Sequence, residues 1–276
     1  YAAPRLGVPL VSTLHLVEDE VGLLGRFKRD LGAWARRHRA ARTVAVSEAL
    51  RRWYLEAFPV DPATVVTIPN GIPAPPPGTA QERAALRAEF GVAEGELLAV
   101  TVAIFRPGKG HDDLLDAAAL LDEQALRFVL AGSGPEEQRL RARVRREGLE
   151  GRVAFAGFRE DVAALLAAAD VVVHPSHADA LPTALIHALA AGVPSIATDV
   201  GGIPEIVGED AGVLVPPGNP AALAAAVRAL AHDGSRRRRM GAAARARFAS
   251  CFEGGVWARR LRRLYEEVLA EPGRKR

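Results

Sequence analysis

The sequence has 276 residues, enough for one large domain or for two smaller ones that each bury a core. Hydrophobic residues make up 49% and charged residues 25%, the balance of an ordinary globular chain, and no apolar run approaches the roughly 18–20 residues that span a bilayer. A single cysteine, Cys251, excludes an internal disulfide framework and fits a reducing compartment, so we expect a cytoplasmic location.

The net charge is +3, and the basic residues concentrate in three arginine-rich runs at residues 36–39, 139–146 and 236–239. Such runs are usually solvated helix faces. The alternative is attraction to an acidic membrane surface, which would place the protein at the inner face of the membrane as a peripheral partner. Only 5% of the residues are aromatic and no stacking platform is visible, so nucleic acid is not expected as a partner.

The chain opens with what resembles the end of a helix, followed by a buried strand at residues 8–13, with His15 in the loop just beyond it. This is an abrupt start for a domain, so we expect that an amino-terminal portion is missing. Helices are predicted at residues 31–42 and 47–58, with a short strand at 44–46 between them.

The next strand, residues 64–68, leads into a proline-rich connection. Asn-Gly in the turn at residues 69–71 tolerates positive φ, and four of the six residues from 73 to 78 are proline. This composition predicts a stiff linker, so we place a domain boundary near residue 75. A helix at 80–90 follows.

A continuous apolar run with β-branched residues at 97–105 predicts a central strand. The loop beyond it carries Arg106 and Lys109, separated by Pro-Gly, and a helix is expected at 111–121. Two cations at the carboxyl end of a strand suit a diphosphate, because each can meet a different phosphoryl oxygen. Charged loop tips are also common on protein surfaces, so the residue types alone leave both interpretations open.

Two similar connections follow. A strand at 127–131 leads into Gly132-Ser133-Gly134, which is either a tight turn or a phosphate contact, and an arginine-rich helix is expected at 136–147. A strand at 152–156 precedes Phe158, which is a candidate for stacking on a base or for packing in the core.

The stretch from residue 170 to 205 alternates strands, loops and helices in the order typical of a parallel α/β fold. A β-branched strand hands over to a loop with Asp179, a helix at 182–192 and a further strand. Gly201 and Gly202 then open another helix. The two helix starts offer unpaired backbone N–H groups to an anion, for which phosphate is the natural candidate. A short strand at 211–215 and helices at 221–232, 235–250 and 254–270 complete the chain, and the last helix has an amphipathic packing face.

The stretch from His174 to Glu205 resembles the large retaining glycosyltransferase family of the GT-B architecture, which uses nucleotide-sugar donors. In that family, two Glu residues eight positions apart flank a Gly-Phe-Pro-like turn, and Ala-x-Ala-x-Gly-x-Pro and Gly-Gly-x-x-Glu follow. The matching residues are Pro182, Ala188, Ala190, Gly192, Pro194, Gly201, Gly202 and Glu205. Asp179 stands in the place of the first Glu and His187 in the place of the second.

The resemblance implies an α/β fold of the GT-B type in three parts. Residues 1–75 would be the carboxyl-terminal part of the acceptor-side Rossmann-like domain with the linker. Residues 76–252 would form the Rossmann-like donor domain. Residues 253–276 would form a helix that crosses back to buttress the first domain, with a tail.

The resemblance also assigns roles to particular residues. Arg106 and Lys109 would bind the donor diphosphate, His15 would lie near the acceptor and the transferred sugar, and Asp179 would contact the sugar hydroxyls. The rest of the nucleotide would be bound by Gly132, Phe158, His187, Gly201 and Gly202. His187 would meet the ribose, where a neutral imidazole offers one acceptor in place of the two of a carboxylate. We therefore expect weaker or altered donor recognition.

The implied reaction is the retaining transfer of a sugar from a UDP-, GDP- or ADP-sugar to a polysaccharide, a lipid or a small metabolite. No cofactor is expected. The sequence has no Asp-x-Asp at a strand end and no cluster of His, Cys and Asp, so a required metal is not expected either. Two alternatives stay open: a non-catalytic nucleotide-binding module, and a nucleotide-sugar epimerase. A dinucleotide-dependent dehydrogenase is poorly supported, because no Gly-x-Gly-x-x-Gly lies between a strand and a helix.

Overall fold

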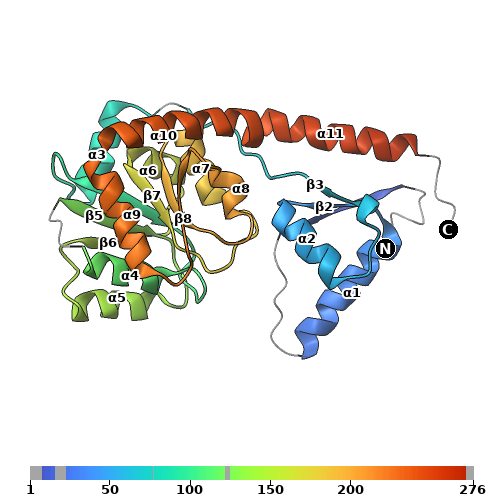
Figure 1. The fold of residues 1–276 in the computed structure, drawn as a ribbon, viewed down its shortest axis with the longest axis horizontal. Helices are drawn as coiled ribbons and strands as arrows, with labels where there is room; N and C mark the ends of the chain where they lie inside the picture. Colours follow the sequence, from blue (N-terminus) through green and yellow to red (C-terminus); the bar gives the residue numbers. More distant parts are fainter. Residues whose placement is uncertain (1–7, 16–22, 77, 122–124, 272–276) are drawn as a thin grey trace.

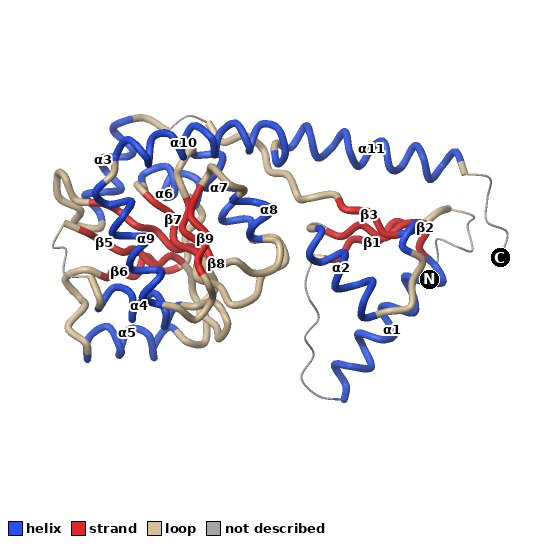
Figure 2. The backbone as a smooth tube through the Cα atoms, viewed as in Figure 1, coloured by secondary structure: helices blue, strands red, loops and turns tan. Residues whose placement is uncertain are grey.

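The computed structural model describes residues 8–15, 23–76, 78–121 and 125–271. Within them the chain forms two parallel sheets, one of three strands in the order β1-β2-β3 and one of six strands in the order β6-β5-β4-β7-β8-β9 (Figure 1). Helices cover both faces of the larger sheet (Figure 2). None of the helices in these residues combines the length and the apolar character needed to cross a bilayer.

The smaller sheet comes from the first part of the chain. Its elements are β1 (Leu10–Leu14), α1 (Leu23–Arg39), β2 (Ala40–Ala45), α2 (Glu48–Ala57), a 3₁₀ turn (Pro62–Thr64) and β3 (Val65–Thr67). The helix predicted at 31–42 begins earlier and ends sooner, because residues 40–45 pair with β1 on one side and β3 on the other. Ser47 caps α2: its hydroxyl accepts a hydrogen bond from the Leu50 N–H at 3.2 Å.

The larger sheet has the strands expected from the apolar runs, each within a few residues of its predicted limits. They are β4 (Leu97–Val102), β5 (Leu126–Ala131), β6 (Val153–Gly157), β7 (Val171–His174), β8 (Ser195–Thr198) and β9 (Gly212–Val215). In β4, Leu98 and Val100 enter one core while Leu97 and Ala99 enter the other. The strand is apolar throughout because both of its faces are buried.

Two layers of helices cover this sheet. On one face lie α3 (Ala80–Glu89), α6 (Val162–Ala168) and α7 (Thr183–Ala191), and on the other lie α4 (His111–Ala119), α5 (Glu137–Arg146) and α9 (Pro220–His232). The remaining helices are α8 (Ile203–Val207), α10 (Gly234–Arg247), a π-helical turn (Phe248–Phe252) and α11 (Gly254–Ala270). Helix α6 was missed by the sequence analysis.

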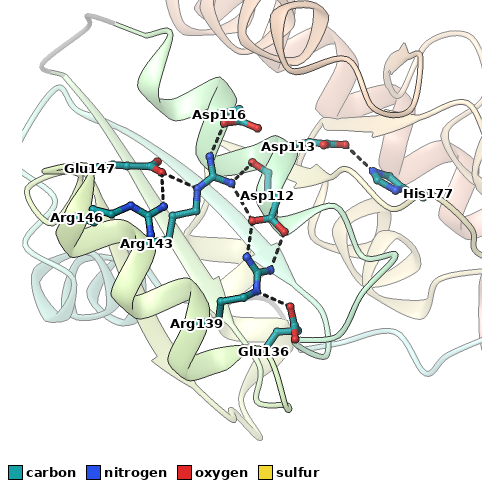
Figure 3. A network of polar contacts seen from close by, with 9 residues as sticks. All are labelled: Asp112, Asp113, Asp116, Glu136, Arg139, Arg143, Arg146, Glu147 and His177. Atoms are coloured by element: carbon teal, nitrogen blue, oxygen red, sulfur yellow. Dashed lines mark hydrogen bonds and ion pairs between the residues drawn. The ribbon is translucent and has the colours of Figure 1, made fainter.

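The arginine run at 139–146 lies on α5 and is largely neutralised by acids (Figure 3). Arg139 pairs with Asp112 and Glu136, and Arg143 pairs with Asp112, Asp116 and Glu147. The network ties α5 to the start of α4. This run is therefore not an open basic surface.

Helix α11 returns to the smaller sheet, as Figure 1 shows. Its Leu264 and Val268 are buried together with Val44 and Ile68 from the first part of the chain. This is the packing face that the apolar spacing predicts. The helix therefore holds the two sheets together through a small apolar core of its own.

Asp170, just before β7, lies at the amino-terminal end of the strands of the larger sheet and links several elements there. Its carboxylate accepts hydrogen bonds from Arg83 and Arg87 of α3, each at 2.8 Å, and from the backbone N–H of Leu98 in β4, also at 2.8 Å. One side chain thus joins a helix and two strands that are more than seventy residues apart in sequence.

We predict that Asp170→Ala lowers the free energy of unfolding by about 2–4 kcal/mol, because two guanidinium groups and a strand N–H lose their shared acceptor. Urea unfolding followed by circular dichroism measures this change. The matched control is Glu267→Ala, which removes only an exposed pair with Arg263 on α11 and should cost less than about 0.5 kcal/mol. Equal effects of the two substitutions would contradict the role given to Asp170.

Candidate functional site

Three loops meet at the carboxyl end of the larger sheet. They follow β4, β7 and β8, which are neighbours in the sheet, although β5 and β6 separate β4 from β7 in sequence. The connection from β4 leads to one side of the sheet and that from β7 to the other. In parallel α/β sheets, ligands bind at such a switch point.

The loop after β4 packs directly on the loop after β7. The Gly108 carbonyl accepts a hydrogen bond from the His177 N–H at 2.8 Å and another from the Ser176 hydroxyl at 3.2 Å. Gly110 has φ +70°, and an added Cβ would overlap the Pro175 carbonyl oxygen. Only glycine fits this position, so the contact fixes where Lys109 projects.

Lys109 and Asp179 form an ion pair between these two loops. The Lys109 Nζ lies 2.6 Å from Asp179 Oδ2, and the Nε2 of the buried His174 lies 3.1 Å from the same oxygen. Burial alone would raise the pKa of Asp179, but the hydrogen bonds and charges of His174 and Lys109 outweigh it and hold the pKa below its usual value. Asp179 is therefore a carboxylate at neutral pH. Arg106, in the same loop as Lys109, is exposed.

The glycine pair after β8 packs against the same loop. Gly201 has φ +52°, and a Cβ added there would overlap the Asp179 carbonyl oxygen. The N–H of Gly202 donates to that carbonyl at 3.1 Å. The N–H of Gly202 is therefore not one of the unpaired amides expected at this helix start, because the close packing of the loops already uses it. Helix α8, which follows, has only five residues.

Glu205 of α8 reaches across to the smaller sheet's helix α2. Its carboxylate accepts hydrogen bonds from the backbone N–H groups of Glu48 and Ala49, both at 2.8 Å. Together with Ser47, it satisfies three of the amides at this helix start, where a negative charge is also favoured by the helix dipole. From the sequence, Glu205 was recognisable only as part of the Gly-Gly-x-x-Glu motif, and its contact with α2 was not predicted.

His15 lies near the contact between α2 and the loop after β8, as two neighbouring contacts show. It follows Leu14, whose carbonyl accepts a hydrogen bond from the Val46 N–H at 3.3 Å. Ser47, which follows Val46, lies against Gly202, since a Cβ added to that glycine would come 2.8 Å from the Ser47 Cβ. His15 is exposed. It lies where the end of β1 approaches the loops of the larger sheet.

A separate hollow lies beyond β4, β5 and β6. Its volume is about 290 Å³, and it is lined mainly by apolar groups from Val102, Ala103, Ile104, Ala131, Gly132, Ser133, Phe158, Arg159 and Val162. Phe158 is 73% exposed, so of its two candidate roles the structure excludes packing in the core. Gly132 approaches the Ala103 carbonyl so closely that a side chain would overlap it, which by itself explains the glycine.

His187 lies on α7 and is half-buried, and its Nδ1 has no hydrogen-bond partner among the described residues. Burial lowers the pKa of His187. The imidazole is therefore neutral at pH 7 and has an unused polar atom.

His111, at the first position of α4, was also missed by the sequence analysis. Its ring is almost fully buried and stands edge-on to Phe105, with 5.0 Å between the ring centroids. Its Nε2 has no partner among the described residues, and burial lowers its pKa to about 4. No sequence signal distinguished this histidine from a polar residue at the start of a helix. Among the residues that the structure describes, no three His, Cys, Asp or Glu side chains gather as a metal site.

The chain thus has two Rossmann-like parallel sheets, and the loops after β4, β7 and β8 of the larger sheet lie toward the smaller one. This arrangement is typical of a GT-B fold. Comparison with known proteins agrees. Residues 82–247 match the family model described as glycosyl transferases group 1, and residues 1–74 match that described as glycosyltransferase family 4.

Relatives and solved structures support the same assignment. The chain is 35% identical to a D-inositol 3-phosphate glycosyltransferase of Kineococcus radiotolerans, over 99% of this chain and 69% of that protein. It is 32% identical to the N-acetyl-alpha-D-glucosaminyl L-malate synthase of Bacillus anthracis, over 67% of this chain and 49% of that protein. The chain thus spans about half to two thirds of the length of these relatives. The Anabaena protein HepE, solved in complex with UDP-glucose, superposes with a TM-score of 0.87 at 24% identity, over 96% of this chain and 74% of that one.

The chain therefore belongs to the glycosyl transferases group 1 family. The resemblance stated from the sequence is confirmed at the level of family and fold.

We predict that replacing His111 makes the protein less sensitive to mild acid. The unfolded chain takes up a proton on this residue near its ordinary pKa of 6.5, whereas the folded chain does so only near 4. The stability that depends on the neutral ring is thus complete above pH 6.5 and is lost as the pH falls toward 4. In His111→Leu, the free energy of unfolding between pH 6.5 and 4.5 should fall less steeply, by up to about 1 kcal/mol per pH unit.

Urea titrations at several pH values measure this slope. His111→Asn is the matched control: it differs in packing but should give the same shallow slope, because it cannot take up a proton. The pKa of Asp179 is lowered from 3.8 in the folded protein, so its contribution to stability is lost only as the pH falls below that value. Asp179 therefore does not affect the slope between pH 6.5 and 4.5. An unchanged slope in both variants would refute the burial argument.

Proposed function

We propose that this chain binds a nucleotide-diphosphate sugar at the loops after β4, β7 and β8 and serves the transfer of that sugar to an acceptor hydroxyl. The observation that carries the proposal is the meeting of Lys109, Asp179 and Gly201 at one switch point of the larger sheet. Membership of the glycosyl transferases group 1 family supports it. In this proposal residues 1–75 serve the acceptor side, residues 76–252 the donor side, and residues 253–276 connect the two.

Lys109 and Arg106 would bind the diphosphate. Glycosyl transfer leaves negative charge on the departing diphosphate, and two cations from one loop can stabilise it as it develops. Lys109 is held by Asp179 in this structure, so a bound phosphate would take the place of that carboxylate. Asp179 would then be released to accept hydrogen bonds from the sugar hydroxyls. Arg106, which is exposed, needs no such exchange.

From the diphosphate, the base would extend toward the hollow beyond β4, β5 and β6, and the ribose would lie beside α7. The hollow lined by Gly132 and Phe158 has an apolar lining and an exposed aromatic ring, features that suit a planar base. His187 would meet the ribose with its imidazole ring. The base could be that of a UDP-, GDP- or ADP-sugar.

On the acceptor side, His15 would approach the transferred sugar from the end of β1. The contact of Glu205 with α2 supports this arrangement, because it holds the smaller sheet against the donor loops. The acceptor is a polysaccharide, a lipid or a small metabolite. The proposed outcome is retention at the anomeric carbon, with the cationic side chains taking the role that a divalent metal has in other transferases. We also propose a cytoplasmic location.

We predict that Arg106→Ala and Lys109→Ala each weaken the binding of nucleoside diphosphate by about 10- to 100-fold, because each loses a charge-assisted contact worth about 1.5–3 kcal/mol. Isothermal titration against UDP, GDP and ADP measures the affinities, and the same series identifies the base. The control is Arg145→Ala, an exposed cation on α5 that should change nothing. Full affinity in both loop variants would remove the proposed diphosphate site. Tight binding of intact donor without transfer or hydrolysis by the full-length protein would favour the non-catalytic alternative.

We predict that His187→Glu strengthens donor binding by roughly tenfold or more, because a carboxylate can accept hydrogen bonds from both ribose hydroxyls. His187→Gln, which stays neutral, is the matched control and should gain little. The deoxyribose nucleotide separates the cause: it should not benefit from His187→Glu. If the ribose and deoxyribose nucleotides gain equally, His187 does not face the ribose.

A further inference from the structure

A different hollow lies at the amino-terminal end of the strands of the larger sheet, and we call it the amino-end hollow. Its volume is about 330 Å³. It is lined by Ala167, Ala169 and Asp170, which precede β7, and by residues 191–194, which precede β8. Helices α3 and α10 add four cationic side chains, which are Arg83, Arg237, Arg238 and Arg245. The loops after β4, β7 and β8 lie at the opposite end of the same sheet.

Three helices end beside this hollow, and their last carbonyls hold the arginines in place. Arg83 donates to the Ala167 carbonyl in the last turn of α6 at 2.7 Å. Arg245 donates to the Ala191 carbonyl that ends α7 at 3.1 Å. Arg237 donates to two carbonyls in the last turn of α9. A helix end has unpaired carbonyls and about half a negative charge, so capping explains why arginines gather here.

Capping by carbonyls does not neutralise the positive charge, because a carbonyl is a neutral acceptor. Arg238 likewise donates to a neutral group, the Ser235 hydroxyl, at 3.1 Å. Asp170 is the one acid among the residues that line the hollow, and Arg83 shares it with Arg87. Four guanidinium groups thus face one carboxylate and three helix ends of about half a negative charge each. Positive charge stays in excess by roughly one to two units.

The arginines of α10 differ in this respect from those of α5. Acids of α4 and α5 pair with Arg139 and Arg143 (Figure 3). In the part of the chain that the structure describes, Arg237, Arg238 and Arg245 contact only carbonyl and hydroxyl oxygens. Their charge therefore remains available to an anion from solution.

We propose that the amino-end hollow binds a phosphate dianion, either as free phosphate or as the monoester of a small metabolite. A phosphate monoester carries a charge of about −1.5 to −2 at neutral pH, which matches the excess positive charge. Guanidinium groups offer paired N–H donors that fit phosphate oxygens. Because the cations line a concave hollow, a small anion can contact several of them at once.

This inference does not rest on the proposed function. Strands β7 and β8 have four residues each, so on the order of 13 Å of strand separates the amino-end hollow from the loops at the other end. A phosphate bound here would leave the proposed donor site open.

Isothermal titration with inorganic phosphate at low ionic strength tests the proposal. It is made on the whole chain and on Arg106→Ala/Lys109→Ala, which removes the proposed diphosphate contacts and should still bind one phosphate. Arg238→Gln/Arg245→Gln should weaken this binding at least tenfold, because two charge-assisted contacts are lost. The same glutamine variant should keep the affinity of the unmodified chain for UDP. Failure of this inference and failure of the proposed function are thereby distinguishable.

Two further variants separate a built site from general charge. Arg262→Gln/Arg263→Gln removes the same charge from the exposed side of α11 and should keep full phosphate binding. Arg238→Lys/Arg245→Lys keeps the charge but lacks the planar donor pair, so it should lose less than the glutamine variant. Because Arg238 and Arg245 are exposed, circular dichroism should show these variants folded.

Glycerol 3-phosphate, titrated alongside, identifies the source of the phosphate. Tighter binding than inorganic phosphate indicates a monoester, and weaker binding indicates free phosphate.

Three results would overturn the proposal. One is equal phosphate binding by the unmodified chain and Arg238→Gln/Arg245→Gln. The second is an equal loss in the α11 variant, which would show attraction to the charge of the whole chain. The third is a response to both phosphates that sodium chloride of the same ionic strength reproduces.

Discussion

The ion pair between Lys109 and Asp179 is the contact on which the arrangement of the loops after β4 and β7 depends. It joins two loops that lead to opposite faces of the sheet, and the ring of His174, at the end of β7, also contacts the Asp179 carboxylate. Without Asp179, a lysine in this largely buried place would be an uncompensated charge, which is costly to bury. The ion pair removes that cost. Under the proposed function, the donor diphosphate would take the place of this carboxylate.

The glycines make this arrangement sterically possible. Gly110, Gly201 and Gly202 each stand where a neighbouring carbonyl leaves no room for a side chain. They bring three loops into backbone contact, and the cationic and acidic side chains project from that common base. The glycines of the family motif therefore allow these loops to pack closely, and the amide of Gly202 donates to the Asp179 carbonyl within that packing.

The sequence predicted most of the larger sheet, because buried parallel strands are continuous apolar runs and their loops carry recognisable glycines and charges. The sequence did not predict the role of a residue whose contact partner is distant in the chain. The bond of Glu205 to α2 spans more than 150 residues, and the isolation of His111 depends on how Phe105 packs. Helix α6 is short and rich in alanine, so neither its length nor its periodicity marked it. Phe158 is exposed because its loop ends at a hollow, which no local pattern encodes.

The chain passes between the two sheets twice, once before α3 and once before α11, and the two passages touch. Ile72 bridges to Glu253, with its N–H bonded to the Phe252 carbonyl at 3.0 Å and its carbonyl accepting from the Gly254 N–H at 2.8 Å. Because the two connections are hydrogen-bonded to each other side by side at this one place, we expect the halves to rotate about it rather than to slide past each other. Opening of the junction would therefore follow a hinge axis near Ile72, and the bonds of Glu205 to α2, on the far side of that axis, would be the ones to break.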